Sequence, residues 1–387
     1  MGVGKGSVRS IAFYLPQYHP IPENDAWWGR GFTEWRKAVA AEPRFRGHYQ
    51  PHIPADLGFY DLRSPETRAA QAELARSYGV DGFCYYHYWF NGKRLLNRPF
   101  DEVLASGEPN FPFMLCWANE NWTRTWDGAD HEVLISQTYS IQDDRQHIRS
   151  LFPAFGDRRY ITIDEKPVFL VYRASALPDP VATTDAWREE AQRAGFRDLY
   201  LCRVEAHGPD RGDPTLKGFD AGVEFMPDVN RIGPRVEPGR LGRAVRRIMR
   251  PRSGHRWNFV HRYENVVEMA LAHPATPYVR FRCVMPAWDN SPRRERGAWI
   301  YQGSTPQRYE QWLSATIENF LPPSVQEDLV FTNAWNEWGE GNHLEPDLRW
   351  GRAYLEAHAR AMNHELGRHT RALPIASDRG PSTPPSE

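Results

Sequence analysis

The chain has 387 residues, with 48 Lys and Arg against 49 Asp and Glu, so its formal net charge is -1. This balance excludes the global basic field of many nucleic-acid-binding proteins and the acidic excess of many disordered chains. Hydrophobic residues make up 41% of the chain, with no unbroken run long enough to span a bilayer. Aromatic residues make up 13%, including 15 Trp, which indicates an aromatic-lined site in addition to a core.

The cysteines and the N-terminal segment favour a reduced, cytoplasmic protein. Cys84, Cys116, Cys202 and Cys283 each lie in an apolar run without Cys-x-x-Cys spacing, so we expect small core residues rather than a zinc or redox site. The first twenty residues carry charge but no apolar stretch typical of a secretory signal.

Eight short apolar runs, rich in Val, Ile, Phe and Tyr, read as buried strands. They cover residues 8–15, 82–88, 113–118, 168–172, 199–204, 221–225, 280–285 and 329–334. Helix-like segments alternate with them at 64–78, 99–106, 184–194, 309–320 and 352–366. The alternation predicts an α/β protein, a single (β/α)8 TIM-type barrel over residues 1–370, with a doubly wound sheet as the alternative.

Three segments depart from this alternation. Residues 19–63 form a long first βα loop, and a loop of that length in a compact domain is usually functional. Residues 231–262, a basic insertion after strand six, carry ten Arg against the single acid Glu237. They indicate either a solvated helix face or a docking patch for phosphate, a membrane surface or a lipid-linked sugar. Residues 371–387 read as a disordered C-terminal tail.

Aromatic and polar residues follow the predicted strands, and the chemistry of such a barrel gathers at the carboxyl ends of its strands. Eleven of the fifteen Trp lie in these segments, which predicts a rim of rings that stack on sugar C–H faces, beside polar groups that bind hydroxyls. The expected substrate-binding residues are Tyr14, Tyr18, His19, Trp28, Glu34, Tyr86, His87, Trp117, Asn119, Glu120, Glu224, Trp288, Asp289, Asn290, Trp335, Asn336 and Trp338. His87 is also a possible general base, and Glu120 a possible proton donor.

The sharpest motif is WNEWGEGNHLEPD at residues 335–347. A tight turn after the last strand places Glu337 and Glu340 on one face, and Gly339 and Gly341 allow the backbone that such a turn needs. Two carboxylates converging in an aromatic pocket work as a base and an acid when their pKa values are pushed apart. The alternative is an ordinary pair of surface glutamates.

Several motifs are missing from the sequence. It contains no Asp-x-Asp, no G-x-G-x-x-G, no phosphate-binding P-loop, no His-Glu-x-x-His and no G-x-S-x-G. We therefore expect no cofactor and no metal, and no nucleic-acid partner.

Five strings resemble one family across roughly residues 8–365. They are FYLPQYHPIPENDAWWGRGFTEW, YYHYWFNGKRLLNRPFDEVLASGE, PFMLCWANENWTRTWDG, PAWDNSPRR and NAWNEWGEGNHLEPD. They look like the WbsX-type proteins, which are glycosyltransferase-like proteins with a glycoside hydrolase family 99-like domain, often linked to bacterial surface polysaccharide biosynthesis. The resemblance implies a (β/α)8 barrel.

Family 99 endo-α-mannosidases carry a strand-eight motif E-W-x-E-G-x-x-x-E-P, which Glu337 to Pro346 match. The resemblance implies that Glu340 is the general acid/base. It also implies that Glu337 acts on the sugar 2-hydroxyl, which attacks the anomeric carbon to give a 1,2-anhydro intermediate, unlike the usual carboxylate pair. The hydrolases usually have His where this chain has Gly339.

These features favour a carbohydrate-active enzyme that cleaves or transfers α-linked sugars of an oligosaccharide or glycan through Glu337 and Glu340. One alternative is a glycosyltransferase with a nucleotide- or lipid-linked sugar donor. The other is a non-catalytic glycan-binding barrel.

Overall fold

The computed structural model describes residues 8–124, 129–228, 230–231, 233–236, 258–320 and 322–362. Eight parallel strands form its centre: β1 (Arg9–Tyr14), β2 (Gly82–Phe90), β4 (Phe113–Trp117), β8 (Lys166–Val171), β9 (Tyr200–Val204), β10 (Ala221–Val223), β12 (Arg280–Val284) and β14 (Leu329–Thr332). Each pairs with the next, and β1 pairs with both β2 and β14, so the sheet closes on itself. The predicted barrel and all eight predicted strands are confirmed.

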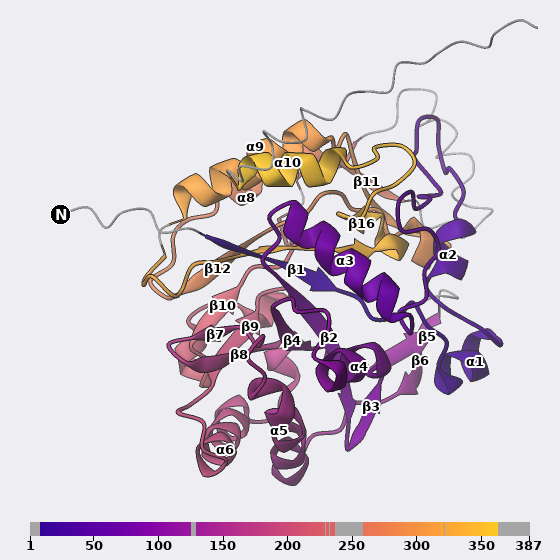
Figure 1. Ribbon diagram of the computed structural model, residues 1–387. Coiled ribbons are helices and arrows are strands. Elements are labelled where there is room, and N and C mark those ends of the chain that lie inside the picture. The colour runs from indigo at the N-terminus through magenta and orange to yellow at the C-terminus, as the bar shows by residue number, and fades with distance from the viewer. Residues whose placement is uncertain are drawn as a thin grey trace, which may run out of the picture.

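Helices surround the barrel, as Figure 1 shows. They are α3 (Pro65–Ser77), α4 (Arg98–Ser106), α5 (Ile141–Phe155), α6 (Pro180–Arg193), α8 (Tyr263–Leu271), α9 (Pro306–Asn319) and α10 (Ala353–Ala361). Between β9 and β10 the chain forms only two 3-10 helices, η3 (Gly208–Asp210) and η4 (Pro214–Lys217). The five predicted helices are confirmed within the described residues, whereas α5 and α8 were not predicted. Helix α5 contains Pro153, a residue type that usually ends a helix, so the sequence pattern did not indicate a helix there.

Three of the helices begin with the same capping chemistry. The side chains of Ser64, Asp179 and Thr305 each accept a hydrogen bond from a backbone N–H in the first turn of α3, α6 and α9. A Pro follows each cap, where its missing N–H costs nothing. Local sequence therefore fixes where these helices start.

The barrel core is apolar and continuous. Strands contribute wholly buried side chains such as Ile11, Phe83, Met114 and Phe331. All four cysteines are buried and unbridged, which confirms that they act as small core residues.

The connections at the end toward which β1 runs are elaborate (Figure 1). The first loop holds α1 (Pro22–Trp28) and α2 (Trp35–Val39), and a hairpin of β5 (Trp122–Arg124) and β6 (Ala129–Ile135) lies near α1. The remaining short elements are β3 (Lys93–Leu95), β7 (Thr162–Ile163), η2 (Ala174–Ala176), β11 (Phe259–Arg262), η5 (Ser291–Arg293), β13 (Trp299–Gln302), β15 (Asn336–Glu337), η6 (Trp338–Glu340) and β16 (Asn342–His343). The long loop thus has secondary structure of its own.

Most of the basic insertion, the predicted tail and Trp126 lie outside the described residues. Three arginines of the insertion are described: Arg231 lies 3.8 Å from Asp228 and Arg262 3.4 Å from Glu264, while Arg235 stacks over a phenylalanine ring. The domain bounds and the docking role of the insertion stay predictions.

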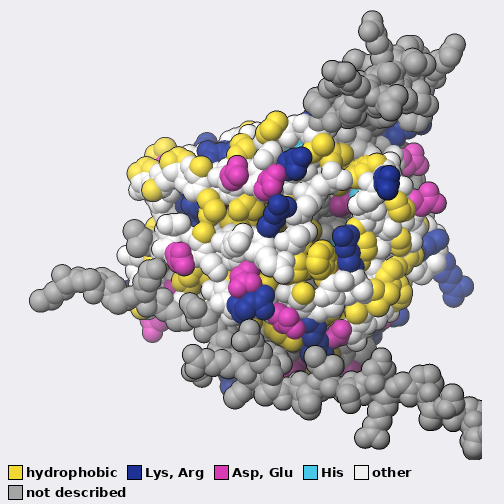
Figure 2. Space-filling model, turned by 90° about the horizontal axis from the view of Figure 1, so that it is seen from above, with side chains coloured by type: hydrophobic (Ala, Val, Ile, Leu, Met, Phe, Trp, Pro, Cys, Tyr) yellow, Lys and Arg dark blue, Asp and Glu magenta, His cyan; other side chains and the backbone are white. Residues whose placement is uncertain are grey.

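One face of the molecule shows how the charged side chains are distributed. On the face shown in Figure 2, basic and acidic side chains are interspersed rather than gathered into a field of one sign. Among the described residues, no helix is long and apolar enough to cross a membrane.

Substitution of Gly82 tests how tightly β2 packs in the barrel. A Cβ at Gly82 would lie 2.8 Å from the Ile161 side chain and 3.0 Å from the Pro112 carbonyl oxygen. We expect Gly82→Ala to lower the free energy of unfolding by about 1–3 kcal/mol through overpacking, measured by urea denaturation. Gly208→Ala, whose Cβ meets nothing within 4 Å, is the matched control and should change it by less than about 0.5 kcal/mol. Equal effects of the two substitutions would contradict the prediction.

Candidate active site

A small hairpin after β14 carries the two predicted catalytic glutamates. Strand β15 pairs antiparallel with β16, and η6 forms the turn between them. The turn ends at Gly341, whose φ of 54° is left-handed, a conformation that Gly adopts without strain. The tight turn that the sequence predicted is therefore present.

Asn336 fastens this hairpin to the end of β1. Its side-chain oxygen accepts a 2.7 Å hydrogen bond from the Leu15 N–H, and its amide nitrogen donates to the Leu15 carbonyl at 3.0 Å. The Tyr18 hydroxyl donates to the Asn336 carbonyl and accepts from the Trp338 N–H. Because both partners are buried, these bonds fix the hairpin relative to the barrel.

Glu345 holds the turn in place through hydrogen bonds. Its carboxylate accepts hydrogen bonds from Trp338 Nε1 at 2.7 Å, Gln71 Nε2 at 2.6 Å and the Tyr60 hydroxyl at 2.8 Å. The Trp338 ring also stacks on His343, with 3.7 Å between centroids. Within the motif, Glu337 and Glu340 are therefore the candidate catalytic residues, and the side chains of Trp338, His343 and Glu345 hold the turn in place.

Arg293 is the centre of the site. Its guanidinium contacts three carboxylates: Nε lies 2.8 Å from Glu34, Nη2 2.6 Å from Glu337 and Nη1 2.7 Å from Glu340. Glu34 comes from the first loop, Arg293 from η5 and the other two from the last hairpin. Three distant segments thus meet at one partly buried cation, whose charge offsets the repulsion among the acids.

The electrostatics favour a protonated acid at Glu340. Burial raises the pKa of Glu340 to about 8, and the nearby Glu337 carboxylate adds to this rise while Arg293 opposes it. Burial likewise raises the pKa of Glu34 to about 7. A carboxyl group that keeps its proton near neutral pH can act as a general acid.

The packing of the Glu34 side chain leaves no room for a side chain at position 339. A Cβ at this position would lie 1.7 Å from Glu34 Oε1 and 2.9 Å from Arg293 Nε. The space that a side chain at 339 would take is therefore filled by the Glu34–Arg293 pair.

A cavity of about 290 Å³ opens beside this cluster. Glu340 and Arg293 line it, together with Trp27, Trp28 and Trp122. The other lining residues are Gln17, Asn24, Tyr88, Glu120, Asn121, Thr123, Leu134, Asn290 and Arg294. Polar groups between flat rings suit the hydroxyls and C–H faces of a sugar.

The structure brings some of the predicted residues to this cavity. Trp28, Glu120, Asn290 and Glu340 line it, and Glu34 and Glu337 join it through Arg293. Tyr86 is half-buried, and its pKa is raised by burial and by the nearby Glu337 and Glu340.

Other predicted residues support the site without lining this cavity. Tyr14, Tyr18, His19, His87, Trp117, Asn119, Trp335, Asn336 and Trp338 are all buried. His87, for example, bonds to His147 at 3.0 Å, and burial lowers its pKa to about 3, which leaves it a weak base. Asn119 holds the backbone of Arg173.

Glu224 is placed elsewhere. It pairs with His273, Arg280 and Arg282 at 2.7–3.3 Å, so its carboxylate serves an ion cluster away from the candidate site. The strand ends at Val223, and the following side chain points into this cluster rather than into the cavity.

The predicted tryptophan rim is smaller than the sequence suggested. Trp117, Trp335 and Trp338 are at most 1% exposed, so they fill the core or support the hairpin that carries Glu337 and Glu340. Bulky rings at strand ends pack inward here because the long loops cover them. The tryptophans that line the cavity are Trp27, Trp28 and Trp122.

The most important residue that sequence reasoning missed is Arg293. It lies in the quoted string PAWDNSPRR, and a basic residue after a predicted barrel strand, in a chain with several acids at other strand ends, was the available signal. Tyr88, the last residue of the predicted strand 82–88, also lines the cavity but was not among the expected substrate-binding residues. Trp27 and Trp122, which line it too, belong to the predicted tryptophan rim.

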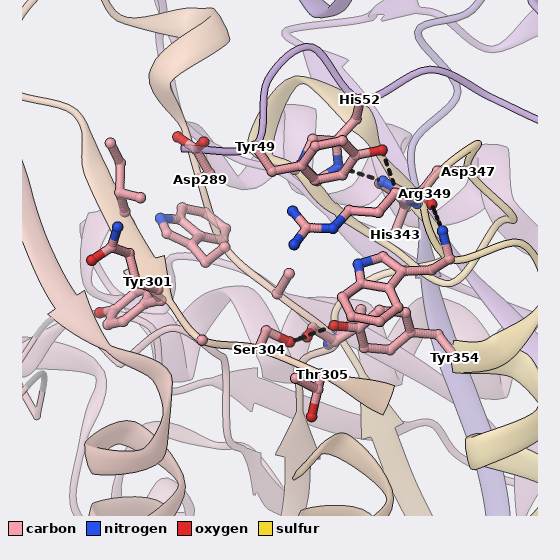
Figure 3. Close-up of a pocket in the computed structure, with 18 of the residues that line it drawn as sticks. Tyr49, His52, Asp289, Tyr301, Ser304, Thr305, His343, Asp347, Arg349 and Tyr354 are labelled. Atoms are coloured by element: carbon pink, nitrogen blue, oxygen red, sulfur yellow. Dashed lines mark hydrogen bonds between the residues drawn. The ribbon is translucent and has the colours of Figure 1, made fainter. Parts of the chain in front are cut away.

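A second cavity, of about 340 Å³, lies on the other side of the Gly341 turn. Figure 3 shows Tyr49, His52, Asp289, His343, Asp347, Arg349 and Tyr354 around it. Predicted residues Trp288 and Asp289 line this cavity instead of the first. Asp289 accepts hydrogen bonds from Gln50 at 2.7 Å and contacts His48 at 2.6 Å, so its carboxylate ties the first loop to the strand-seven loop.

The chain is thus a closed (β/α)8 barrel with acidic and aromatic side chains at the carboxyl ends of its strands, where barrels of this kind carry their active sites. The sequence profile of the family described as "Glycosyltransferase WbsX" matches residues 10–358, and the chain belongs to this family.

Two curated relatives come from Xanthomonas campestris pv. campestris, strains B100 and ATCC 33913, each called "Uncharacterized protein WxcX". Both are 43% identical to the chain over 371 residues. The match covers 95% of this chain and 50% of each relative, so the chain spans about half the length of these proteins.

Solved structures share the fold at low identity. A GH99 endo-α-mannosidase from Bacteroides thetaiotaomicron has a TM-score of 0.55 at 14% identity, covering 94% of this chain and 99% of that one. A "Glycoside hydrolase-like protein" has a TM-score of 0.57 at 13% identity, covering 94% and 95%. These similarities establish the architecture.

Gly339→Ala tests the packing of the carboxylate cluster. The added methyl group occupies the position of the Glu34 carboxylate, so we expect displacement of Glu34 from Arg293 and a loss of about 1–3 kcal/mol in unfolding free energy. The double variant Gly339→Ala with Glu34→Ala makes room for the methyl group and should recover part of that loss. Denaturation of wild type, both single variants and the double variant completes the cycle, and additive losses would contradict the prediction.

Proposed function

We propose that the chain is an enzyme that cleaves or transfers α-linked sugars with retention of configuration, in the synthesis of a bacterial surface polysaccharide. The observation that carries this proposal is the shared position of Glu337 and Glu340 on Arg293, with Glu340 at the base of an aromatic cavity. Membership of the WbsX family and the barrel shared with a GH99 endo-α-mannosidase support it.

In the first step, Glu340 donates its proton to the glycosidic oxygen as that bond breaks. Glu337 accepts the proton of the sugar 2-hydroxyl, whose oxygen attacks the anomeric carbon and forms a 1,2-anhydro sugar. In the second step, the Glu340 carboxylate takes a proton from water or from an acceptor hydroxyl, whose oxygen opens the anhydro ring at the anomeric carbon. Glu337 returns its proton to the 2-oxygen, so both acids end as they began.

Arg293 serves both steps through charge. It holds Glu337 in place by a 2.6 Å contact, so a positive charge lies beside the group that takes up the proton of the 2-hydroxyl. Its contact with Glu340 opposes the rise in the pKa of that acid, so the carboxyl releases its proton more readily than burial alone would allow.

Glu340→Gln is the central test. We expect kcat to fall by about 10²–10⁴-fold because the amide donates no proton to the leaving oxygen, while the affinity for glycan changes little. Glu73→Gln, on the exposed side of α3, is the matched control and should keep full activity. The assay uses α-linked oligosaccharides, with and without an acceptor sugar, and products are separated by chromatography. Full activity of Glu340→Gln on a substrate that wild type turns over would contradict the mechanism.

The pH dependence gives a second test. Because Glu340 must be protonated to act first, and its pKa is about 8, we expect kcat/KM to stay level up to about pH 8 and then fall about tenfold per pH unit. A rate measured from pH 5 to 10 shows this descending limb. A limb centred near the ordinary carboxyl pKa would instead assign the acid role to another group.

The principal alternative is transfer from an activated donor. The family description favours it, and a segment rich in Arg at 231–262 could hold a pyrophosphate or contact a lipid-linked sugar. Thermal shifts on wild type separate the two functions: stabilisation by a nucleotide-sugar and none by oligosaccharides favours the transferase. Binding of oligosaccharides without turnover favours a glycan-binding barrel.

A further inference from the structure

We propose that His52, His343 and Asp347 form a binding site for a divalent transition-metal ion such as Zn²⁺, at the edge of the second cavity. One ligand atom from each side chain lies within 4.8 Å of the other two. The residues come from the first loop, from β16 and from the segment after it, and all three are buried. Figure 3 shows them gathered at one side of the cavity.

The hydrogen bonds of His343 prepare it to be a ligand. Its Nδ1 lies 2.8 Å from the Glu345 carbonyl oxygen, which accepts hydrogen bonds only, so Nδ1 carries the ring proton. The lone pair of the neutral ring is therefore on Nε2, which faces His52 Nδ1 at 2.8 Å. A ring N–H bonded to a backbone carbonyl is the usual support of a metal-bound His.

The spacing of the two rings is close to that of a metal site. Zn–N bonds of about 2.0–2.1 Å at tetrahedral angles hold two ligand nitrogens about 3.3 Å apart. The two facing nitrogens would separate by about half an ångström, and His52 would move its proton from Nδ1 to Nε2. Both rings stay neutral when the ion binds, because the ion takes the place of the hydrogen that lies between His52 Nδ1 and His343 Nε2.

Asp347 supplies an oxygen ligand that is already oriented. Its carboxylate accepts hydrogen bonds from the Trp350 N–H at 2.6 Å and from the Tyr49 hydroxyl at 3.1 Å. Two His and one carboxylate are a donor set that suits Zn²⁺. Three protein ligands leave a fourth position, which the adjoining cavity can fill with water or with an oxygen of a bound molecule.

The site lies next to the turn that carries Glu340. A Cβ at Gly341 would approach the His52 ring at 3.3 Å, and His343 directly follows the hairpin residue Asn342. An ion here would join the first loop to β16 and so restrain the segment that carries Glu340. This role does not depend on the reaction proposed for Glu340.

The test is metal binding by the untagged full chain after dialysis against EDTA. We expect about one Zn²⁺ per chain by titration calorimetry, a rise in Tm with Zn²⁺, and for Co²⁺ the visible absorption bands of a four-coordinate site. His52→Asn, His343→Asn and the nearly isosteric Asp347→Asn should each weaken binding by at least about tenfold. His48→Asn is the matched control, because His48 lines the same cavity outside the cluster, and it should bind as wild type does.

Two results would overturn the site. One is the absence of saturable binding by folded wild type up to about 1 mM Zn²⁺ or Co²⁺. The other is unchanged affinity in the three ligand variants. Circular dichroism establishes that each variant is folded, and Asp347→Asn keeps the comparison open if a His variant is not. A glycan assay on the same samples is read separately, since a chain that binds Zn²⁺ without turning over sugar retains the site while losing the proposed function.

Discussion

The candidate active site depends on one cation, Arg293. Its guanidinium contacts Glu34, Glu337 and Glu340 at 2.6–2.8 Å, and removal of its charge would leave three acids together in a poorly hydrated place. Burial raises the pKa of Glu340, and the charge of Arg293 opposes that rise. A carboxyl group that keeps its proton near neutral pH is what proton donation at this site requires.

The supporting structure serves this arrangement. Asn336 fixes the hairpin to β1, Glu345 binds the Trp338 indole beneath the turn, and Gly339 leaves room for Glu34. The Asn336 and Gly339 contacts join segments far apart in the chain, whereas the Glu345 bond lies within the motif itself. The long first loop supplies Glu34, His52 and two of the three tryptophans of the cavity wall, Trp27 and Trp28.

The sequence motif of this chain differs from that of the family 99 hydrolases at one position. Those hydrolases usually carry His between the Trp and the second Glu of their motif, whereas this chain carries Gly339 and fills the space with the Glu34–Arg293 pair. In this chain a guanidinium holds both glutamates, so Arg293 contributes to the electrostatics of the site together with the acids.

The sequence by itself determined the barrel, because strand and helix periodicity and cap residues such as Ser64 and Asp179 act locally. It also determined the two glutamates, since Glu337 and Glu340 are close along the chain. Only the tertiary structure decided that Arg293 joins them, that Glu224 does not, and that His52 meets His343 from 291 residues away. Strand-end position alone cannot tell a buried supporting Trp from one that lines a cavity, because the covering loops decide which rings are exposed.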